Sequence, residues 1–347
     1  MNVKIFFTIS ISILILSICS SILLGPVKIT FFEIISIFFD KIGLIEIDAK
    51  NSYYKIQESV LIGIRLPRVI LAILVGTALG LSGAILQGLF RNPLVDPGLI
   101  GVSSGAALGA MSVIIFSSTL NKVFISSITP YLLPIFAMIG SIITTFVVYK
   151  ISKSSNKTNI MTMLLSGIAI NALVGSIIGM LVIKSSDAQL RSFTFWTLGG
   201  LDNANWQVVG ITYLFILIPL ILAYKIRHKL DIFMLGDAQA KNLGINIEKL
   251  KRIIILISAL MVGVSVAFCG MIGFIGLVTP HLVRLLIGPN HNTLLIGSSI
   301  TGSLLLVISD LISRIAISPA QLPISIITSL IGAPFFIWLI IDQKRKL

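Results

Sequence analysis

Charged side chains are scarce in this chain. Only 11% of its 347 residues are Asp, Glu, Lys or Arg, whereas 56% are hydrophobic. A soluble domain usually carries about 25% charged residues, and half of that share cannot cover a globule of this size with a water-compatible surface. The composition therefore argues against a soluble enzyme, a disordered chain or a nucleic-acid-binding protein, and it indicates a polytopic membrane protein.

Cysteines and phosphate-binding motifs are also nearly absent. The two cysteines, Cys19 and Cys269, both lie in apolar runs, so the sequence predicts neither a disulfide framework nor a metal site. The chain has no G-x-x-x-x-G-K-[ST] loop, and no glycine directly precedes a lysine. Because that loop holds the phosphates of ATP, we expect no ATP hydrolysis by that route. We also expect that the chain is not an enzyme and carries no covalently bound cofactor.

Ionisable residues are missing from the centres of the apolar runs. Asp96, Asp310, His281 and Arg284 all lie near the ends of runs. Carriers driven by protons or sodium usually need a buried carboxylate, since intramembrane ionisable groups mark ion pathways, and cation channels need acidic rings. A carrier or channel that works alone is therefore a weaker interpretation than transport powered by a partner. A membrane scaffold that transports nothing is a second alternative. Powered transport would take its energy from a partner.

What the chain does contain is a series of ten apolar runs, separated by polar or Gly/Pro-containing segments. They are 5–25, 66–89, 98–117, 131–149, 160–183, 207–224, 253–272, 274–288, 293–312 and 323–341. About 20 apolar residues cross a bilayer, so the sequence predicts an all-α membrane protein with about ten spans in a single domain, 1–347. The first run could instead be a signal peptide, but no small-x-small cleavage site follows it, which favours an uncleaved span.

The distribution of Lys and Arg predicts the orientation. An even number of spans puts both termini on one side, and with the termini in the cytoplasm most basic residues lie there too, as the positive-inside rule requires. The basic segment 225–252 is then cytoplasmic, and Arg65, Arg68 and Arg314 face the opposite side. The net charge of +13 thus reflects cytoplasmic loops rather than nucleic-acid binding.

Small residues form stripes on two predicted spans. Gly76, Gly80 and Gly83 share one helix face, and Gly101 and Gly105 share a face of the next span. Such stripes let helix backbones pack closely in lipid. They predict a bundle of tightly packed helices, as transporters and channels have.

The cytoplasmic segment 228–252 has the pattern of a docking site for another protein. Asp231 is a candidate cap for a short helix that ends at Gly236, and Asp237 is a candidate cap for a second helix that ends at Gly244. Exposed apolar side chains on two such helices would suit a groove on a partner. Those expected here are Phe233, Met234, Leu235 and Leu243, with Ala240 on the same face as Leu243. The plainer alternative is a basic loop that lies on anionic lipid.

Several motifs follow one another in a fixed order over residues 60–341. They are Arg65-Leu66-Pro67-Arg68, Gln87-Gly88-Leu89-Phe90-Arg91-Asn92-Pro93-Leu94, Asp96-Pro97-Gly98, Leu235-Gly236-Asp237, Thr279-Pro280-His281 after a Gly-Phe-Ile-Gly run, and Gly332-Ala333-Pro334-Phe335-Phe336. Together they resemble the FecCD family, the permease subunits of type II ABC importers for ferric siderophores, haem and cobalamin. One departure is Gln321, which stands where the family usually has Glu before Leu-Pro and puts in doubt any salt bridge made there.

The resemblance implies a type II importer fold, with two permease copies around a central pathway as a homodimer or a heterodimer. It also implies two cytoplasmic ATPase subunits, which use the ATP, and an extracytoplasmic binding protein. Arg65, Arg68 and Arg314 match arginines that pair with glutamates of the binding protein, although arginines that snorkel to the membrane interface would look the same. The residues that match the ATPase-coupling helices are Leu235, Gly236, Asp237, Ala240, Leu243 and Gly244.

In this family the binding protein supplies most of the specificity, so the permease sequence is a weak guide to the cargo. The runs 100–109 and 286–291 are most similar to haem permeases, which places haem slightly ahead of a ferric siderophore, with cobalamin third. His281 is expected to cap a helix rather than to bind haem. The Ile- and Lys-rich composition suggests the cell membrane of a low-GC Gram-positive bacterium.

Overall fold

The computed structural model describes residues 1–44, 52–124, 128–154, 157–318 and 320–345. The described chain is almost entirely helical, with one short hairpin of strands β1 and β2. The elements are α1 (Val3–Leu23), α2 (Phe31–Lys41), α3 (Ser52–Val60), a π-helical turn (Leu61–Arg65), α4 (Leu66–Phe90), a 3-10 turn (Pro97–Ile100), α5 (Val102–Ile115), α6 (Ser117–Val123), a 3-10 turn (Thr129–Tyr131), α7 (Leu132–Ile151), β1 (Lys153–Ser154), β2 (Lys157–Thr158), α8 (Ile160–Ile183), α9 (Asp187–Thr197), α10 (Trp206–Met234), α11 (Asp237–Asn242), α12 (Ile247–Cys269), α13 (Ile275–Ile287), α14 (His291–Ile315) and α15 (Ile324–Arg345).

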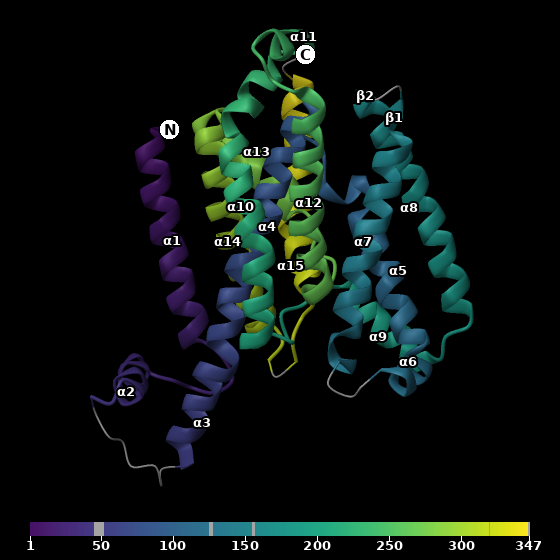
Figure 1. Ribbon diagram of the computed structural model, residues 1–347. Helices are drawn as coiled ribbons and strands as arrows, with labels where there is room; N and C mark the ends of the chain where they lie inside the picture. The colour runs from purple at the N-terminus through teal and green to yellow at the C-terminus, as the bar shows by residue number, and fades with distance from the viewer. Residues whose placement is uncertain (45–51, 125–127, 155–156, 319, 346–347) are drawn as a thin grey trace.

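Ten of these helices correspond to the ten predicted spans. Eight are long and apolar enough to cross a membrane, and α5 and α13 are shorter apolar helices. They run up and down the molecule so that the N-terminus, the C-terminus and α11 all lie at one end (Figure 1). This end is called the α11 end below. The prediction of an all-helical polytopic protein with about ten spans is confirmed.

Helix α4 is the centre of the bundle and packs against α10, α12, α13 and α14. Its glycine stripe is where the backbones come closest. A Cβ atom added to Gly80 would overlap the carbonyl oxygen of Ser298 on α14, and one added to Gly83 would overlap that of Gly276 on α13; Gly76 faces the backbone of Gly302 in the same way. Only glycine permits helix backbones to approach this closely in lipid.

The second glycine stripe brings α5 and α7 close together, but only one of its two predicted glycines takes part. Gly105 faces the carbonyl oxygen of Gly140, so that these two helices also touch through their backbones. Gly101 precedes the helix rather than lying on its face. It has a φ of 86° and links the 3-10 turn to α5, a conformation that glycine adopts at little cost.

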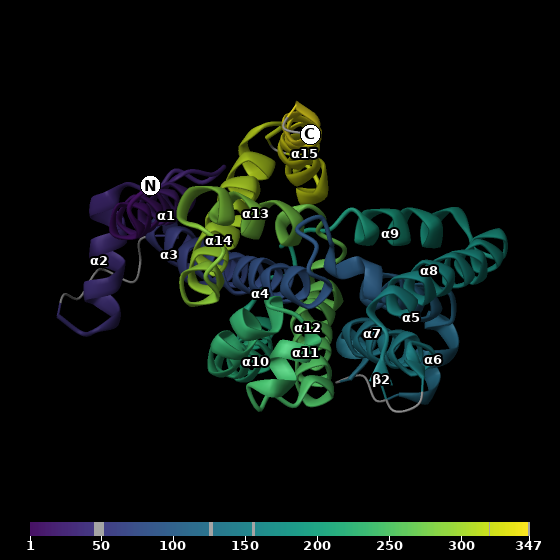
Figure 2. The same ribbon diagram turned by 90° about the horizontal axis from the view of Figure 1, so that it is seen from above.

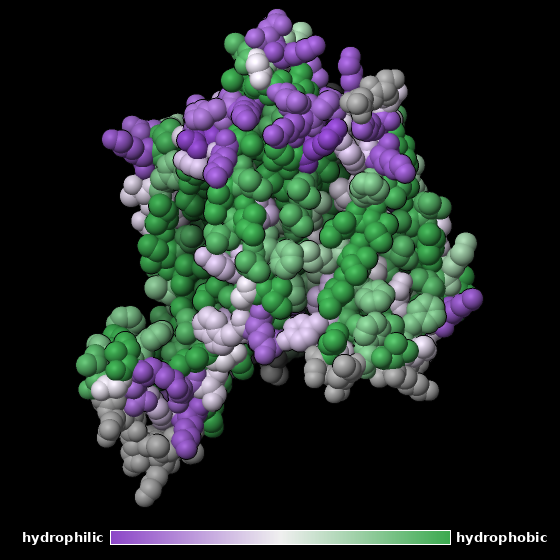
Figure 3. All heavy atoms as spheres, viewed as in Figure 1, coloured by the Kyte–Doolittle hydropathy of each residue, from purple (hydrophilic) through white to green (hydrophobic). Residues whose placement is uncertain are grey.

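The helices at the edge of the bundle have apolar faces that the chain itself does not cover. Only 17% of the most apolar stretch of α8 is buried, and 28% of that of α15. Seen from above, α15 projects from one side of a body made of α4, α12 and α13 (Figure 2). An apolar belt lies below the polar rim of the α11 end (Figure 3), as expected where hydrocarbon chains surround the protein.

Candidate functional site

The α11 end is built on a longer helix than the sequence predicts. The expected separate helix beginning at Asp231 is wrong, because α10 continues without a break to Met234. The chain has no Gly or Pro between Lys225 and Met234 to stop it. Asp231 lies inside α10 and accepts hydrogen bonds from the backbone N–H (3.0 Å) and the ring Nδ1 (2.6 Å) of His291, which joins α10 to the start of α14.

The apolar side chains of this segment divide between core and surface. Phe233 was expected to be exposed but is fully buried, with the guanidinium of Arg91 4.2 Å from its ring centre. Ala240 on α11 is also buried, whereas Leu235 and Leu243 are each 60% exposed. Leu235, just after α10, and Leu243, just after α11, are therefore the exposed leucines of this segment, whereas Ala240 is part of the core.

Asp237 does not cap α11, contrary to the prediction. Gly236, with a φ of 119°, occupies the cap position, and the carboxylate of Asp237 bridges two cations instead. Its Oδ1 lies 2.6 Å from Nη2 of Arg91, and its Oδ2 lies 3.4 Å from Nζ of Lys251. Burial raises the pKa of Asp237, but the hydrogen bond from Arg91 and the charges of both cations outweigh it, so the pKa is lowered.

The same network reaches the hairpin. Lys251 donates to the carbonyl oxygen of Thr158 at 2.9 Å, and Glu248 accepts from the backbone N–H (3.0 Å) and the hydroxyl (2.7 Å) of Thr158. Helix α11 is thus tied to the end of α4, to α12 and to β2. A cavity of about 680 Å³ opens beside it, between the hairpin and α12.

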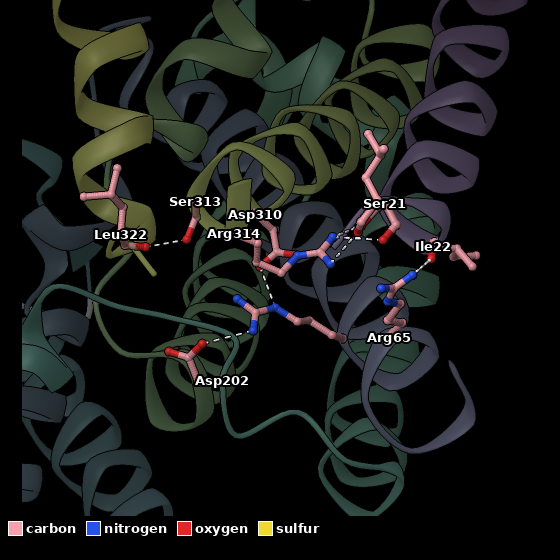
Figure 4. A network of polar contacts seen from close by, with 10 residues as sticks. Ser21, Ile22, Arg65, Asp202, Asp310, Ser313, Arg314 and Leu322 are labelled. Carbon is pink, nitrogen blue, oxygen red and sulfur yellow. Dashed lines mark hydrogen bonds and ion pairs between the residues drawn. The ribbon is translucent and has the colours of Figure 1, made fainter. Parts of the chain in front are cut away.

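The three predicted docking arginines lie at the opposite end, called the arginine end below. Figure 4 shows Arg65 and Arg314 there, and Arg68 shares Asp310 with Arg314. Arg68 donates from Nε to Asp310 at 2.8 Å and from Nη1 to Asp202 at 3.0 Å. Arg314 pairs with the other oxygen of Asp310 at 3.1 Å. Arg65 donates to the carbonyl oxygens of the α1 end, among them that of Ile22 at 2.5 Å.

All three arginine side chains are buried, at 3 to 8% exposure. They join α1, α4 and α14 instead of reaching outward. Their place at the end away from α11 agrees with the predicted topology, whereas their role in docking stays a prediction. The exposed charge of this cluster belongs to Asp202, whose side chain is 61% exposed.

Sequence reasoning missed the two acidic partners of these arginines. Asp310 precedes Arg314 by four residues, and that spacing places opposite charges on one helix face, so a signal was present. Asp202 gave no such signal, because it lies in the loop after α9 and meets Arg68 only in the fold. A cavity of about 410 Å³ opens beside Asp202 and is also lined by Trp196 and Gln321, which places the unusual glutamine at the same end.

His281 lies in the interior of α13 and caps nothing, so the capping prediction is wrong. It is 6% exposed, its Nδ1 has no hydrogen-bond partner in the described chain, and its ring meets the edge of Phe335 on α15 at 6.4 Å between centroids. Arg284, one turn further on, donates to the side-chain oxygen of Gln87 at 3.1 Å. Within the described ranges, no three His, Cys, Asp or Glu side chains form a group that could hold a metal ion.

Ten apolar helices, with a short helix held by ion pairs at one end and a buried charge cluster at the other, define a polytopic helical membrane protein. The model of the FecCD transport family matches residues 13–342. The chain belongs to this family and has the fold of a type II ABC importer permease.

Individual relatives agree with this assignment. The hemin transport system permease protein HmuU of Yersinia pestis is 42% identical over 285 residues, which are 82% of this chain and 84% of that protein. The cobalamin import system permease protein BtuC of Halobacterium salinarum is 37% identical over 283 residues, 82% of this chain and 73% of that protein. A solved inward-facing structure of a metal-chelate type ABC transporter superposes with a TM-score of 0.83 at 30% identity, covering 98% of this chain and 100% of the other.

Proposed function

We propose that this permease carries haem across the cell membrane as part of an ABC importer. The observation that carries the proposal is the 42% identity to the hemin transport permease over most of both chains. Cobalamin is the second candidate, because a cobalamin permease is 37% identical over a similar length. A ferric siderophore is the third, supported by the likeness to a metal-chelate transporter.

In this proposal two ATPase subunits dock at the α11 end, which faces the cytoplasm. The chain itself has no phosphate loop, so hydrolysis belongs to a partner. Leu235 and Leu243 supply the apolar contact, since both are exposed beside the anchored helix. Asp237, held by Arg91 and Lys251, turns movement of the ATPases into movement of α4 and α12. The many basic residues of this end support its cytoplasmic placement.

A second copy of the chain completes the pathway in this proposal, and a binding protein delivers the cargo at the arginine end. The uncovered apolar faces of α8 and α15 support a partner in the membrane. The exposed carboxylate of Asp202 beside the cavity at that end offers a contact for the binding protein. A low-GC Gram-positive origin would make that side the cell exterior.

Transport by the reconstituted complex tests the cargo. The permease, its ATPase and its binding protein are placed in proteoliposomes, and ATP-dependent uptake of labelled haem, cobalamin and a ferric siderophore is compared. We expect haem uptake at least tenfold above that of the other two, a difference of about 1.4 kcal/mol in selectivity. Vesicles with a hydrolysis-deficient ATPase are the control. Uptake of cobalamin or siderophore in preference to haem would overturn the assignment.

A further inference from the structure

A narrow apolar groove follows the seam between α7 and α12. It has a volume of about 330 Å³, and its lining includes Ile142, Phe146, Leu256 and Ala259, with Tyr149 and Arg252 at its upper end. Phe146 and Leu256 are more than half exposed, whereas Ala259 is buried in the floor. From Ile142 to Tyr149 the groove follows about 10 Å of helix.

The groove lies on the side of the molecule away from α15. Figure 2 shows α7 and α12 next to each other on the side opposite α15. Figure 3 views this side and shows an apolar surface below a polar rim. The groove therefore opens toward the hydrocarbon of the membrane, with its upper end at the rim where lipid headgroups lie.

The upper end of the groove is cationic. The Nε of Arg252 donates to the hydroxyl of Tyr149 at 3.0 Å, which fixes the guanidinium at the mouth, and its terminal amino groups have no partner within the described chain. Lys150 and Lys249 are both exposed and lie on the same two helices, one residue from Tyr149 and three from Arg252. None of the described residues that line the groove is acidic.

We propose that the groove binds an anionic phospholipid. One acyl chain lies between Phe146 and Leu256 over Ala259, and the headgroup phosphate accepts hydrogen bonds from the free guanidinium nitrogens of Arg252. A planar guanidinium with unused N–H groups matches a phosphate in a two-pronged geometry, and a tyrosine beside it suits the interface between headgroups and chains.

The site has a consequence for the α11 end. Arg252 directly follows Lys251, which holds Asp237 and Thr158. A lipid that bridges α7 and α12 beside this network binds the folded seam and so stabilises it. Anionic lipid would then support the geometry that anchors α11.

Lipid retention by the full-length permease tests the site. Protein from nanodiscs with equal amounts of phosphatidylglycerol and phosphatidylcholine is transferred to detergent, and retained lipids are counted by native mass spectrometry. Wild-type protein should retain phosphatidylglycerol, and Arg252→Gln should lower that retention about tenfold, as expected for loss of a charge-assisted hydrogen bond. Ala259→Phe, which fills the floor, should lower it equally with Arg252 intact.

Arg227→Gln is the matched control. Arg227 also lies at the α11 end, over a tyrosine, Tyr224, at 3.8 Å, and is bonded to Asn292, but it does not line the groove. The Arg227→Gln variant should retain as much phosphatidylglycerol as the wild-type protein. An equal loss in Arg227→Gln would show general attraction to a basic surface and overturn the site.

Two further arms separate a lipid from a phosphate group alone. Glycerol 3-phosphate in excess should not displace the lipid, and full retention in Ala259→Phe would contradict an acyl chain in the groove. If Ala259→Phe does not elute as a folded protein, Leu256→Gln, at an exposed wall position, decides the same question. Equal retention of phosphatidylcholine and phosphatidylglycerol by wild type would also overturn the proposal.

Discussion

The two ends of this permease hold their charges in opposite ways. At the arginine end, the side chain of Asp310 is 1% exposed and pairs with two buried arginines. At the α11 end, the side chain of Asp237 is 47% exposed and shares its carboxylate between a partly exposed arginine and a lysine. Removing one member of a buried pair is costly because it leaves an uncompensated charge, whereas exposed pairs contribute little.

This difference fits two different tasks. The buried cluster joins α1, α4 and α14 across three distant parts of the chain, so it holds those helices in one arrangement. At the α11 end the half-exposed carboxylate of Asp237 lets water screen its pair with Arg91, whereas Lys251 on its other side is buried. We therefore interpret the arginine end as a fixed frame and the α11 end as an adjustable joint.

The largest expected effect is on the frame. Asp310→Ala leaves the buried Arg314 without its carboxylate partner and leaves Arg68 with only the exposed Asp202. We expect it to lower the free energy of unfolding by about 3–5 kcal/mol. Thermal unfolding of the detergent-purified protein measures the change. Asp202→Ala is the control, because it removes only an exposed partner of Arg68 and should cost about 1 kcal/mol or less. Equal losses from both variants would refute the distinction between buried and exposed ion pairs on which the comparison of the two ends depends.

The next effect concerns the joint and appears in transport rather than in stability. Ala240→Pro removes the N–H that donates to the carbonyl oxygen of Gly236 at 2.9 Å, and proline in a helix interior costs about 3 kcal/mol locally. We expect ATP-driven uptake to fall at least tenfold while ATPase activity continues. Ala238→Pro is the matched control, since its N–H lies in the first turn, where proline is tolerated. Normal uptake by Ala240→Pro would remove α11 from the coupling path.

The smallest effect is the pH dependence of the joint. The pKa of Asp237 is lowered in the folded protein from its ordinary value of 3.8, so its contribution to stability is fully present above that value and is lost as the pH falls through the lowered pKa. The melting temperature of wild type should exceed that of Asp237→Asn by a small, constant amount at neutral pH. The gap should close only below pH 3.8. A gap that already narrows near pH 6 would point to another titrating group.

Much of the bundle could be predicted because hydropathy is a local property. Each apolar run predicts its own helix, and the stripe containing Gly80 and Gly83 predicts close packing without naming the partner helix. The prediction of a separate exposed helix from Asp231 was wrong, and so was the expected exposure of Phe233. Mixed polar and apolar residues near a membrane boundary have the same pattern as an exposed amphipathic helix. The surrounding helices, not the local pattern, decide that α10 continues and that Phe233 is buried.

The sequence by itself determined the class of protein, the number of spans and the absence of a phosphate loop, because these depend on which residues follow one another. Only the tertiary structure decided which charges neutralise each other. Arg68 and Asp310 are 242 residues apart in the chain, and Asp237 meets Arg91 only after α10 and α4 have packed. Desolvation and Coulomb attraction depend on distance and burial, and neither can be read from residues in a line.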